Sequence, residues 1–352
     1  MKILIDTGHP AELHFFSHTA KQLEKNGHSV FFVIRAKDCA LPVAQNLRLK
    51  FVSKGSGSYA IFLKPFYFIR ALWVLFATAR SIKPDVFLSF ASPYAGVIAR
   101  LFKKPHIAFL DTEHGKLLRW LDKNFSSHMI TPSCFQQELG AKQITIDTYK
   151  ELAYLSPAYF KPIADIRKEL NLPEKYMLVR LVNHGAIHDV FKKQWNRKSK
   201  LQWVARLAKK YPVVISSEIK LPAELESYRL TAPAHLYHQV LAHAKLVVGE
   251  SATVAAESAV LGVPAVYIEY NSLGYVKELE KKYGLIRHYL PNAVGLRNAE
   301  TFIHAAMQKP KNSKHKEKSQ QLLSEKTDAT AFMVWFIENY PESAERGKVF
   351  FE

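Results

Sequence analysis

The sequence predicts an α/β fold of two domains, each built on a parallel sheet. At 352 residues, the chain is longer than one typical hydrophobic core supports. Apolar runs of strand length alternate with helix-length segments in both halves, and the connecting loops are short. The clearest unit spans residues 245–268 and is predicted to be a strand, a tight turn, a helix, a turn and a strand.

The N-terminal half opens with an apolar strand, a turn and an amphipathic helix. Ile3 to Ile5 form the strand, and apolar residues at helical spacing predict a helix from Ala11 to Lys25. Further strands are predicted over residues 29–34, 84–90 and from 105 into a polar loop, and further helices over 61–77 and 93–102. This order is typical of a doubly wound sheet.

The turn after the first strand is a candidate ligand site. Gly8 and His9 belong to this turn, which lies at the carboxyl end of the strand, where doubly wound sheets bind ligands. His14 and His18 lie one helical turn apart on the next helix. They suit a solvated helix face equally well, and no matched carboxylate makes them a metal pair. If His14 faces the ligand, it would serve as an acid/base group.

A second candidate group ends the strand that begins at Pro105. Asp111 and Glu113 alternate along the chain, so in an extended segment their carboxylates share one side. Carboxylates at such a place can act as general bases or bind sugar hydroxyls. The alternative is that they cap a helix and solvate a loop.

Residues 61–77 are apolar nearly all round. Arg70 interrupts the segment. The longest uncharged run in the segment is shorter than the roughly 20 residues that a membrane span needs. We therefore do not expect it to cross a membrane. Either the helix is buried against the sheet, or its aromatic side enters the interface of an anionic membrane, flanked by Lys64, Arg70, Arg80 and Lys83.

The C-terminal half repeats the alternation after an interdomain crossing at residues 149–162. Strands are predicted over residues 176–182, 213–218 and 245–248, and helices over 195–210 and 236–244. Arg180, His184 and His188 bring hydrogen-bond donors to the place where a diphosphate would lie. Ser217 and Glu218 form the polar end of the next strand. The alternative is a polar loop without a ligand.

The segment 245–268 is the strongest candidate for phosphate binding. Gly249 permits a sharp bend, and Ser251 or Thr253 can cap the helix that follows. Such a helix directs N–H groups and a partial positive charge toward the ligand edge of the sheet. Glu257, one turn into the helix, is placed to accept hydrogen bonds from the two hydroxyls of a ribose. An ordinary buried strand–helix–strand unit is the alternative.

Cysteine content, net charge and missing motifs exclude several classes of protein. Cys39 and Cys134 are the only cysteines, which supports neither a disulfide framework nor a cysteine-rich metal site. Residues 1–6 are predicted to be a buried strand rather than a signal peptide, so a reducing cytoplasm is expected. The net charge of +18 implies an anionic partner. Nucleic acid is not expected, because the sequence has no homeodomain, zinc-finger, RRM or KH signature.

The segment 245–268 also carries a resemblance. Gly249-x-Ser251-x-Thr253, Glu257 and Leu261-Gly262-x-Pro264 resemble the donor-nucleotide element of GT-B glycosyltransferases. The N-acetylglucosaminyltransferase of the muramyl pathway and the non-hydrolysing UDP-N-acetylglucosamine 2-epimerases share this element. The resemblance implies that the helix N-terminus holds the diphosphate and that Glu257 holds the ribose. Ala252 departs from the pattern, because many related GT-B enzymes have glycine there.

Motifs along almost the whole chain resemble domain of unknown function 354, a GT-B-like family associated with polysaccharide assembly. The matching motifs are residues 6–11, 111–114, 150–155, 179–180 with 188–189, 215–218 with 221–222, and 257–264. GT-B proteins return their last helix to the first domain. The resemblance therefore implies a first domain of residues 1–155 with the helix of 327–352 packed on it through Phe332, Trp335 and Phe336, and a second domain of residues 156–326.

The sequence as a whole predicts two Rossmann-like domains that face a cleft, and a glycosyltransferase that uses a nucleotide-diphosphate sugar. The acceptor is expected to be a glycan or a lipid-linked sugar in cell-surface polysaccharide assembly. No cofactor or metal is expected, since protein donors offset the phosphate charge. The candidate bases are His14, Asp111 and Glu113. The candidate nucleotide-sugar contacts are Gly8, His9, Arg180, His184, His188, Ser217, Glu218, Glu250, Ser251, Ala252, Thr253 and Glu257.

Two alternatives stay open, and a location follows from the main hypothesis. The first is a nucleotide-sugar 2-epimerase. That family has an Asp soon after the strand at 86–90, where this sequence has Ser89-Phe90-Ala91-Ser92, and tends to have a second glutamate after Glu257, where this sequence has Ser258. A non-catalytic nucleotide- or glycan-binding protein is the other alternative. The predicted location is the cytoplasm, peripheral on the anionic inner face of the plasma membrane.

Overall fold

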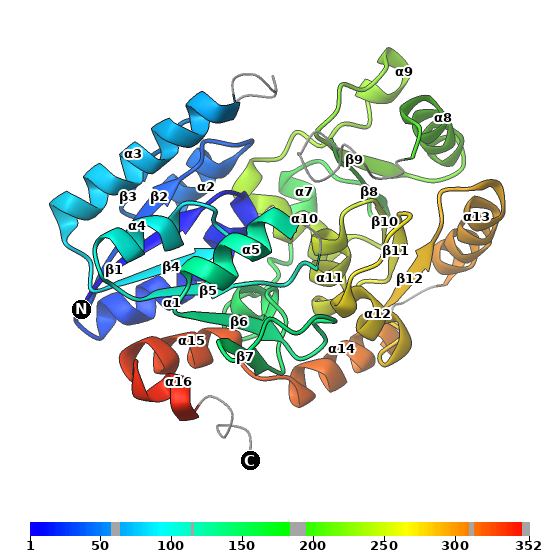
Figure 1. Ribbon diagram of the computed structural model, residues 1–352. Coiled ribbons are helices and arrows are strands. Elements are labelled where there is room, and N and C mark those ends of the chain that lie inside the picture. Colours follow the sequence, from blue (N-terminus) through cyan, green and yellow to red (C-terminus); the bar gives the residue numbers. More distant parts are fainter. Residues whose placement is uncertain (58–63, 114–115, 184–194, 310–312, 347–352) are drawn as a thin grey trace. The chain divides into compact units, whose positions relative to one another are not determined.

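The computed structural model describes residues 1–57, 64–113, 116–183, 195–309 and 313–346 (Figure 1). The chain divides into two compact units. The first unit comprises Met1–Tyr154 and Thr327–Glu352, and the second comprises Leu155–Lys326.

The first unit is built on a seven-stranded sheet with the order β3-β2-β1-β4-β5-β6-β7. All neighbouring strands pair in parallel. The strands are β1 (Lys2–Thr7), β2 (Ser29–Ile34), β3 (Phe51–Ser53), β4 (Val86–Phe90), β5 (His106–Phe109), β6 (His128–Pro132) and β7 (Gln143–Ile146). Strand β1 is central and its Ile3, Leu4 and Ile5 are fully buried. The strand order reverses between β1 and β4, so the expected ligand edge lies at their carboxyl ends.

Two helix layers cover this sheet. Helices α3 (Lys64–Ile82), α4 (Ala95–Leu101) and α5 (Lys116–Phe125) adjoin one another in one layer. The other layer holds α1 (Pro10–Lys25), α2 (Ala40–Asn46) and α15 (Ala329–Glu338), followed by α16 (Glu342–Arg346) (Figure 1). The chain adds β2 and β3 on one side of β1 and then β4 to β7 on the other side. Because the crossovers between parallel strands are right-handed, the helices of these two series cover opposite faces of the sheet. The short α6 (Leu152–Leu155) follows β7.

Helix α15 belongs to the first unit although it comes from the far end of the chain. Asp328 caps it by accepting hydrogen bonds from the N–H groups of Thr330 and Ala331. The Thr327 N–H donates to the Asp147 carbonyl at 2.9 Å. Phe332 and Phe336 are buried, and α15 packs against α1.

The second unit has a five-stranded parallel sheet with the order β12-β11-β10-β8-β9. Its strands are β8 (Met177–Leu181), β9 (Val213–Ser217), β10 (Leu246–Gly249), β11 (Ala265–Ile268) and β12 (Ile286–Tyr289). Its helices are α7 (Ile166–Glu169), α8 (Arg197–Ala208), α9 (Ala223–Glu226), the 3-10 turn η3 (Ala234–Leu236), α10 (Tyr237–His243), α11 (Ala252–Val260), α12 (Gly274–Lys281), α13 (Ala293–Gln308) and α14 (Ser313–Glu325). Trp203, Val248 and Ile303 belong to its main apolar core.

The structure gives a different reason for Gly249 than the sharp bend that the sequence suggested. Gly249 has no left-handed backbone; it is required because a Cβ there would lie 2.3 Å from the Arg180 carbonyl oxygen on the neighbouring strand. Of the two alternatives for the segment 61–77, neither holds for every side of α3: Leu75 and Ala79 pack in the core, whereas Phe66 and Trp73 are 70% and 67% exposed. None of the helices that the structure describes is long and apolar enough to cross a bilayer.

Candidate functional site

The first part of the candidate site is the start of α11, directly after β10. Ser251 is the residue that caps the helix: its Oγ accepts a hydrogen bond from the Val254 N–H at 3.2 Å. Ala252 and Thr253 therefore form the first helical turn at the carboxyl edge of the second sheet. The amides of a first turn lack intrahelical acceptors and carry the positive end of the helix dipole, so this edge favours an anion.

Arg180 reaches the same edge from the end of β8. Its guanidinium donates to Ser216 Oγ at 2.9 Å and forms an ion pair with Glu218. Glu218 also accepts the Asn183 N–H at 3.1 Å. The structure thus brings Arg180 and Glu218 together, but as partners of each other. Ser217 is turned into its own loop, where its hydroxyl donates to the Ile219 carbonyl at 2.7 Å.

Glu257 lies one turn into α11 and is 4% exposed. Its Oε1 is 3.0 Å from Nε2 of His238 on α10, which is also buried. The neighbouring Tyr237 has its pKa raised by burial, so its phenol stays neutral and can donate a hydrogen bond. Sequence reasoning missed His238, because the contact joins two helices and no local pattern indicates it.

Glu250 forms a buried ion pair with Lys200 of α8. The Lys200 ammonium lies 2.7 Å from both carboxylate oxygens, and Oε2 also accepts the Val182 N–H at 3.3 Å. Glu250 and Lys200 are 4% and 3% exposed. Protein donors therefore surround the Glu250 carboxylate, and this pair fastens α8 to the turn that precedes α11. His184, His188 and Asp189 lie outside the described residues.

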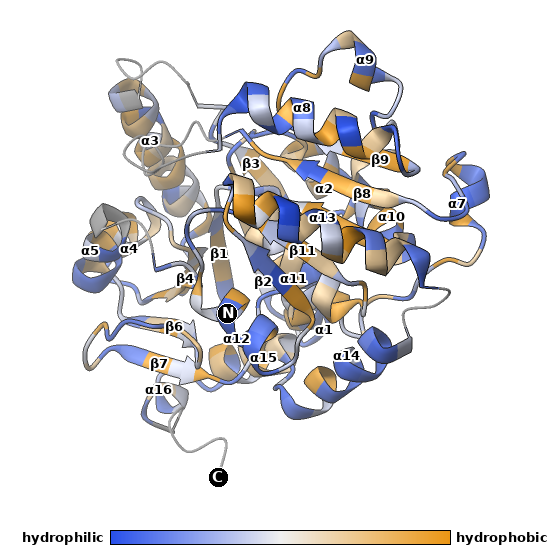
Figure 2. Cartoon of the chain, turned by 90° about the vertical axis from the view of Figure 1, so that its right-hand side faces the viewer, coloured by the Kyte–Doolittle hydropathy of each residue, from blue (hydrophilic) through white to orange (hydrophobic). Residues whose placement is uncertain are grey.

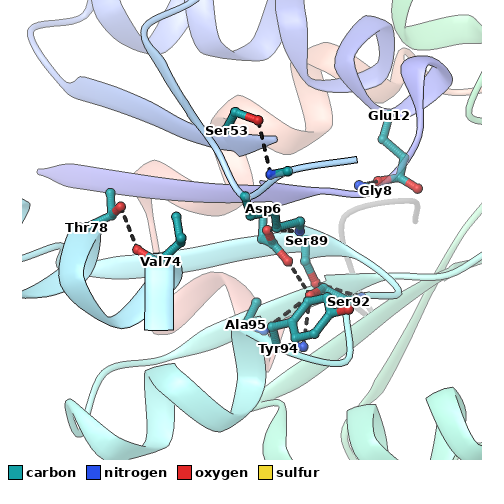
Figure 3. Close-up of polar contacts among 12 residues, drawn as sticks. Asp6, Gly8, Glu12, Ser53, Val74, Thr78, Ser89, Ser92, Tyr94 and Ala95 are labelled. Atoms are coloured by element: carbon teal, nitrogen blue, oxygen red, sulfur yellow. Dashed lines mark hydrogen bonds and ion pairs between the residues drawn. The ribbon is translucent and has the colours of Figure 1, made fainter. Parts of the chain in front are cut away.

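In the first unit, the carboxyl edge between β1 and β4 holds a buried polar cluster that sequence reasoning missed (Figure 3). Asp6 is 1% exposed, forms an ion pair with Lys54 and accepts a hydrogen bond from Ser92. The Ser92 hydroxyl accepts the N–H groups of Tyr94 and Ala95 at 3.1 and 3.2 Å (Figure 3). These contacts hold the end of β1 to the segments that follow β3 and β4.

The predicted residues of the first turn and His14 have partners within the first unit. His9 caps α1, since its Nδ1 accepts the Ala11 N–H at 3.2 Å. The Gly8 N–H donates to the Glu12 carboxylate at 2.6 Å (Figure 3). His14 is half-buried, and its ring lies 5.5 Å from the ring of Tyr154.

Asp111 and Glu113 do not act as a pair. The Lys150 ammonium donates to Asp111 Oδ2 at 2.6 Å, and Thr112 Oγ1 donates to Oδ1 at 2.7 Å. Glu113 instead accepts the Gln136 N–H at 3.3 Å. Within the described ranges, no three His, Cys, Asp or Glu side chains are grouped so that they could hold a metal ion.

Comparison with known proteins places the fold. No family model matches the chain, so the resemblance to domain of unknown function 354 is not shown, and no curated protein matches it. Among solved structures, the Methanocaldococcus jannaschii UDP-GlcNAc 2-epimerase in complex with UDP-GlcNAc and UDP is 14% identical, with a TM-score of 0.68 over 97% of this chain and 100% of that one. The Neisseria meningitidis UDP-GlcNAc 2-epimerase bound to UDP-GlcNAc is 14% identical, with a TM-score of 0.64 over 96% and 100%.

A glycosyltransferase is equally similar. The spinosyn forosaminyltransferase is 15% identical to this chain, with a TM-score of 0.64 over 98% of this chain and 99% of that one. At such low identity these likenesses show the fold alone. The fold is the α/β, GT-B-like arrangement with two parallel sheets that the sequence predicts.

Proposed function

We propose that this protein is a metal-independent glycosyltransferase that moves a sugar from a nucleotide-diphosphate donor to a glycan or lipid-linked acceptor in cell-surface polysaccharide assembly. The observation that carries the proposal is the arrangement of α11: a half-buried first turn at the carboxyl edge of the sheet, with a buried glutamate one turn further in. Two similar structures contain UDP-GlcNAc, which supports a nucleotide-sugar as the ligand.

In this proposal the donor lies along the edge of the second sheet. The first-turn amides of α11 and the Arg180 guanidinium stabilise the negative charge that develops on the diphosphate as the bond to the sugar breaks. Glu257, oriented by His238, accepts hydrogen bonds from the ribose hydroxyls. Glu218 and Ser216 fix the direction of Arg180.

The main alternative is a nucleotide-sugar 2-epimerase. The fold does not separate the two, because both kinds of enzyme are similar to this chain. The end of β4 favours the transferase. Ser89 and Ser92 stand there in place of the carboxylate that an epimerase would use, and both hydroxyls are bound within the protein. A non-catalytic binding protein would have no need of acid/base groups at the first unit's edge.

The substitution Glu257→Gln tests the donor site. It removes a charged acceptor from the ribose position, so the dissociation constant for UDP is expected to rise by the equivalent of about 1–3 kcal/mol. Calorimetry with UDP and UDP-GlcNAc measures this, and Glu317→Gln, an exposed glutamate on α14, is the matched control. Unchanged affinity in Glu257→Gln would remove Glu257 from the site.

The reaction itself separates the alternatives. Wild-type protein incubated with UDP-GlcNAc and polyprenyl-diphosphate-linked saccharides is expected to release UDP only when an acceptor is present. A C2-inverted nucleotide-sugar formed without acceptor would make the protein an epimerase. Binding without any turnover would make it a non-catalytic partner.

The proposed acceptor is consistent with the outer surface of α3. Phe66, Ile69 and Trp73 form one stripe at helical spacing and are 70%, 64% and 67% exposed, whereas Ala71 and Leu75 face the core. Figure 2 shows the apolar character of this helix in contrast to the polar α14. The exposed cations of α3, α4, α5 and the segments between them are Arg70, Arg80, Lys83, Arg100, Lys103, Lys104 and Lys123. Aromatic side chains and cations together suit an anionic lipid surface, to which each cation adds about 1 kcal/mol of attraction.

Phe66→Ser combined with Trp73→Ser is expected to reduce binding to anionic vesicles at least about tenfold, because each buried aromatic contributes about 1.5–3 kcal/mol. Sedimentation with phosphatidylglycerol vesicles measures the change, and circular dichroism confirms folding. Wild-type binding should weaken in salt and be low on phosphatidylcholine. Leu290→Ser with Val294→Ser, two exposed apolar residues of the second unit, is the control. A folded α3 variant that sediments with the vesicles as well as wild type does would contradict the proposal that α3 binds the membrane.

A further inference from the structure

Two arginines of the first unit, Arg35 and Arg70, lie against the same short segment that follows β3. Arg35 comes directly after β2, and its Nε donates to the Ser56 carbonyl at 3.1 Å. Arg70 belongs to α3. A Cβ at Gly55 would lie 3.3 Å from the guanidinium carbon of Arg70, and one at Gly57 would lie 2.7 Å from a guanidinium nitrogen of Arg35. The glycines therefore let both guanidinium groups approach the backbone at the carboxyl edge of β2 and β3.

The charges of these two guanidinium groups are not offset by a carboxylate. The described ion pairs of this edge join Lys54 to Asp6 and Lys150 to Asp111, and neither arginine takes part in one. Arg70 is exposed and Arg35 is half-buried, so a ligand can reach both. Guanidinium groups bind phosphate through pairs of charged hydrogen bonds. A phosphate is therefore the anion that this pair is suited to hold.

Tyr67 of α3 belongs to the same group of side chains. The guanidinium carbon of Arg35 lies over its ring, 5.4 Å from the ring centroid. The Tyr67 hydroxyl is buried and has no hydrogen-bond partner within the described residues. Burial raises the pKa of this phenol, so it stays neutral and keeps its proton as a donor. An anion bound by the arginines would supply the acceptor that this hydroxyl otherwise lacks.

The arginine pair lies beside the exposed apolar stripe of α3. Phe66 and Arg70 are four positions apart on the helix and therefore share one side of it. Phe66, Ile69 and Trp73 are the exposed apolar side chains of this stripe. A ligand with its anionic head on Arg70 can thus place an apolar chain along Phe66. This combination is the chemistry of a phospholipid and not of a free phosphate ion.

We propose that Arg35, Arg70 and Tyr67 bind the headgroup phosphate of an anionic membrane lipid whose acyl chains contact the stripe of α3. The two guanidinium groups and the phenol hydroxyl donate hydrogen bonds to the phosphate oxygens. The Ser56 carbonyl and the Tyr67 ring hold the Arg35 guanidinium in place before the lipid binds. This site rests on the lipid surface of α3 in the proposed function, and it is independent of the sugar transfer.

Dihexanoyl phosphatidic acid, a short-chain lipid added below its micelle concentration, tests the site without a membrane. The Nε–Hε signals of the arginines are followed by NMR during the titration, and Arg35→Lys and Arg70→Lys assign them. We expect saturable shifts for Arg35 and Arg70, and none for Arg80, an exposed cation near the other end of α3. Glycerol 3-phosphate should bind at least about tenfold more weakly, because it lacks the chains. Equal affinities would overturn a lipid as the ligand.

Arg70→Lys separates phosphate recognition from simple attraction between charges. The variant keeps the positive charge but loses the planar fork of donors, so its affinity for the short-chain lipid is expected to fall at least about tenfold. Arg80→Lys is the matched control on the same helix and should bind like wild type. An Arg70→Lys variant that binds the lipid as tightly as wild type would overturn the site.

Tyr67→Phe removes the hydroxyl and keeps the ring beneath Arg35. Its affinity for the short-chain lipid is expected to fall about fivefold to tenfold, the effect of one lost hydrogen bond. Its stability in urea should not fall, because the hydroxyl has no partner within the described part of the chain. Binding as tight as that of wild type would overturn the assignment of this hydroxyl to the phosphate.

Failure of this site and failure of the proposed function can be told apart. A protein that binds UDP-GlcNAc by calorimetry but shows no arginine shifts with the short-chain lipid would overturn the phosphate site alone. A protein that shows those shifts but binds neither UDP nor UDP-GlcNAc would overturn the transferase function and support the phosphate site.

Discussion

Lys200→Met is expected to lower the free energy of unfolding by about 3–5 kcal/mol, because it leaves the Glu250 carboxylate buried without its cation. Both side chains are almost fully buried, and the ammonium contacts both carboxylate oxygens at 2.7 Å. Urea unfolding measures the loss. Lys198→Met, on the exposed side of α8, is the matched control and should change stability by less than about 0.5 kcal/mol.

The double variant Lys200→Met with Glu250→Leu decides what Glu250 does. Replacing both members of a buried ion pair with apolar groups is often close to neutral, so most of the lost stability should return. If Glu250 serves only the fold, the double variant should bind UDP like wild type. A stable double variant that no longer binds UDP would restore Glu250 to the nucleotide site. A single variant as stable as wild type would show that the pair contributes little.

Asp122→Asn is expected to stabilise the protein at pH 8 by about 3–4 kcal/mol more than it does at pH 5. Asp122 is 2% exposed on α5, and neither carboxylate oxygen has a hydrogen-bond partner within the described residues. Burial raises its pKa to about 8. Between the ordinary pKa near 3.9 and this value, the folded state holds the proton that the unfolded state releases. Wild-type stability should therefore fall as pH rises through this window.

Denaturant unfolding at pH 5 and pH 8 measures the effect. The stability of wild type should decline between the two pH values by up to about 1.4 kcal/mol per pH unit from this one group, and the Asp122→Asn variant should lack that contribution. Asp165→Asn, an exposed change in the second unit, is the control. A wild-type stability that is the same at both pH values would contradict the buried, protonated state.

The local elements of the fold could be predicted because their signals lie within short windows. The strand, cap and helix around Ser251 depend on neighbouring residues, and the structure confirms β10, the Ser251 cap and α11 there. Apolar runs predicted β1 and β8 in the same way. Gly249 shows the limit of this reasoning. The sequence suggested that the glycine permits a sharp bend, whereas in the structure a side chain there would collide with the backbone of β8.

The pairs that shape the candidate site could not be predicted, because their members are far apart in the chain. Asp6 and Lys54 are 48 positions apart, and Lys200 and Glu250 are 50 apart. Arg180 and Glu218 are 38 positions apart, and no local pattern indicated their ion pair. The sequence gives the charge of each side chain. It does not show which oppositely charged side chain, distant in the sequence, will lie beside it.

Helix faces illustrate the same limit. The segment 61–77 is apolar on nearly every side, so its periodicity could not show which side faces the sheet. Only tertiary packing leaves Phe66 and Trp73 exposed.

The return of α15 to the first unit has a consequence for synthesis on the ribosome. The partners of α15 on α1 emerge early, but Phe332, Met333 and Phe336 emerge some three hundred residues later. Until then a nascent chain carries an uncovered apolar surface on α1, while residues 155–326 already hold every strand of their own sheet. The second unit is therefore the part that can finish folding during translation. The first unit, although translated first, is completed last.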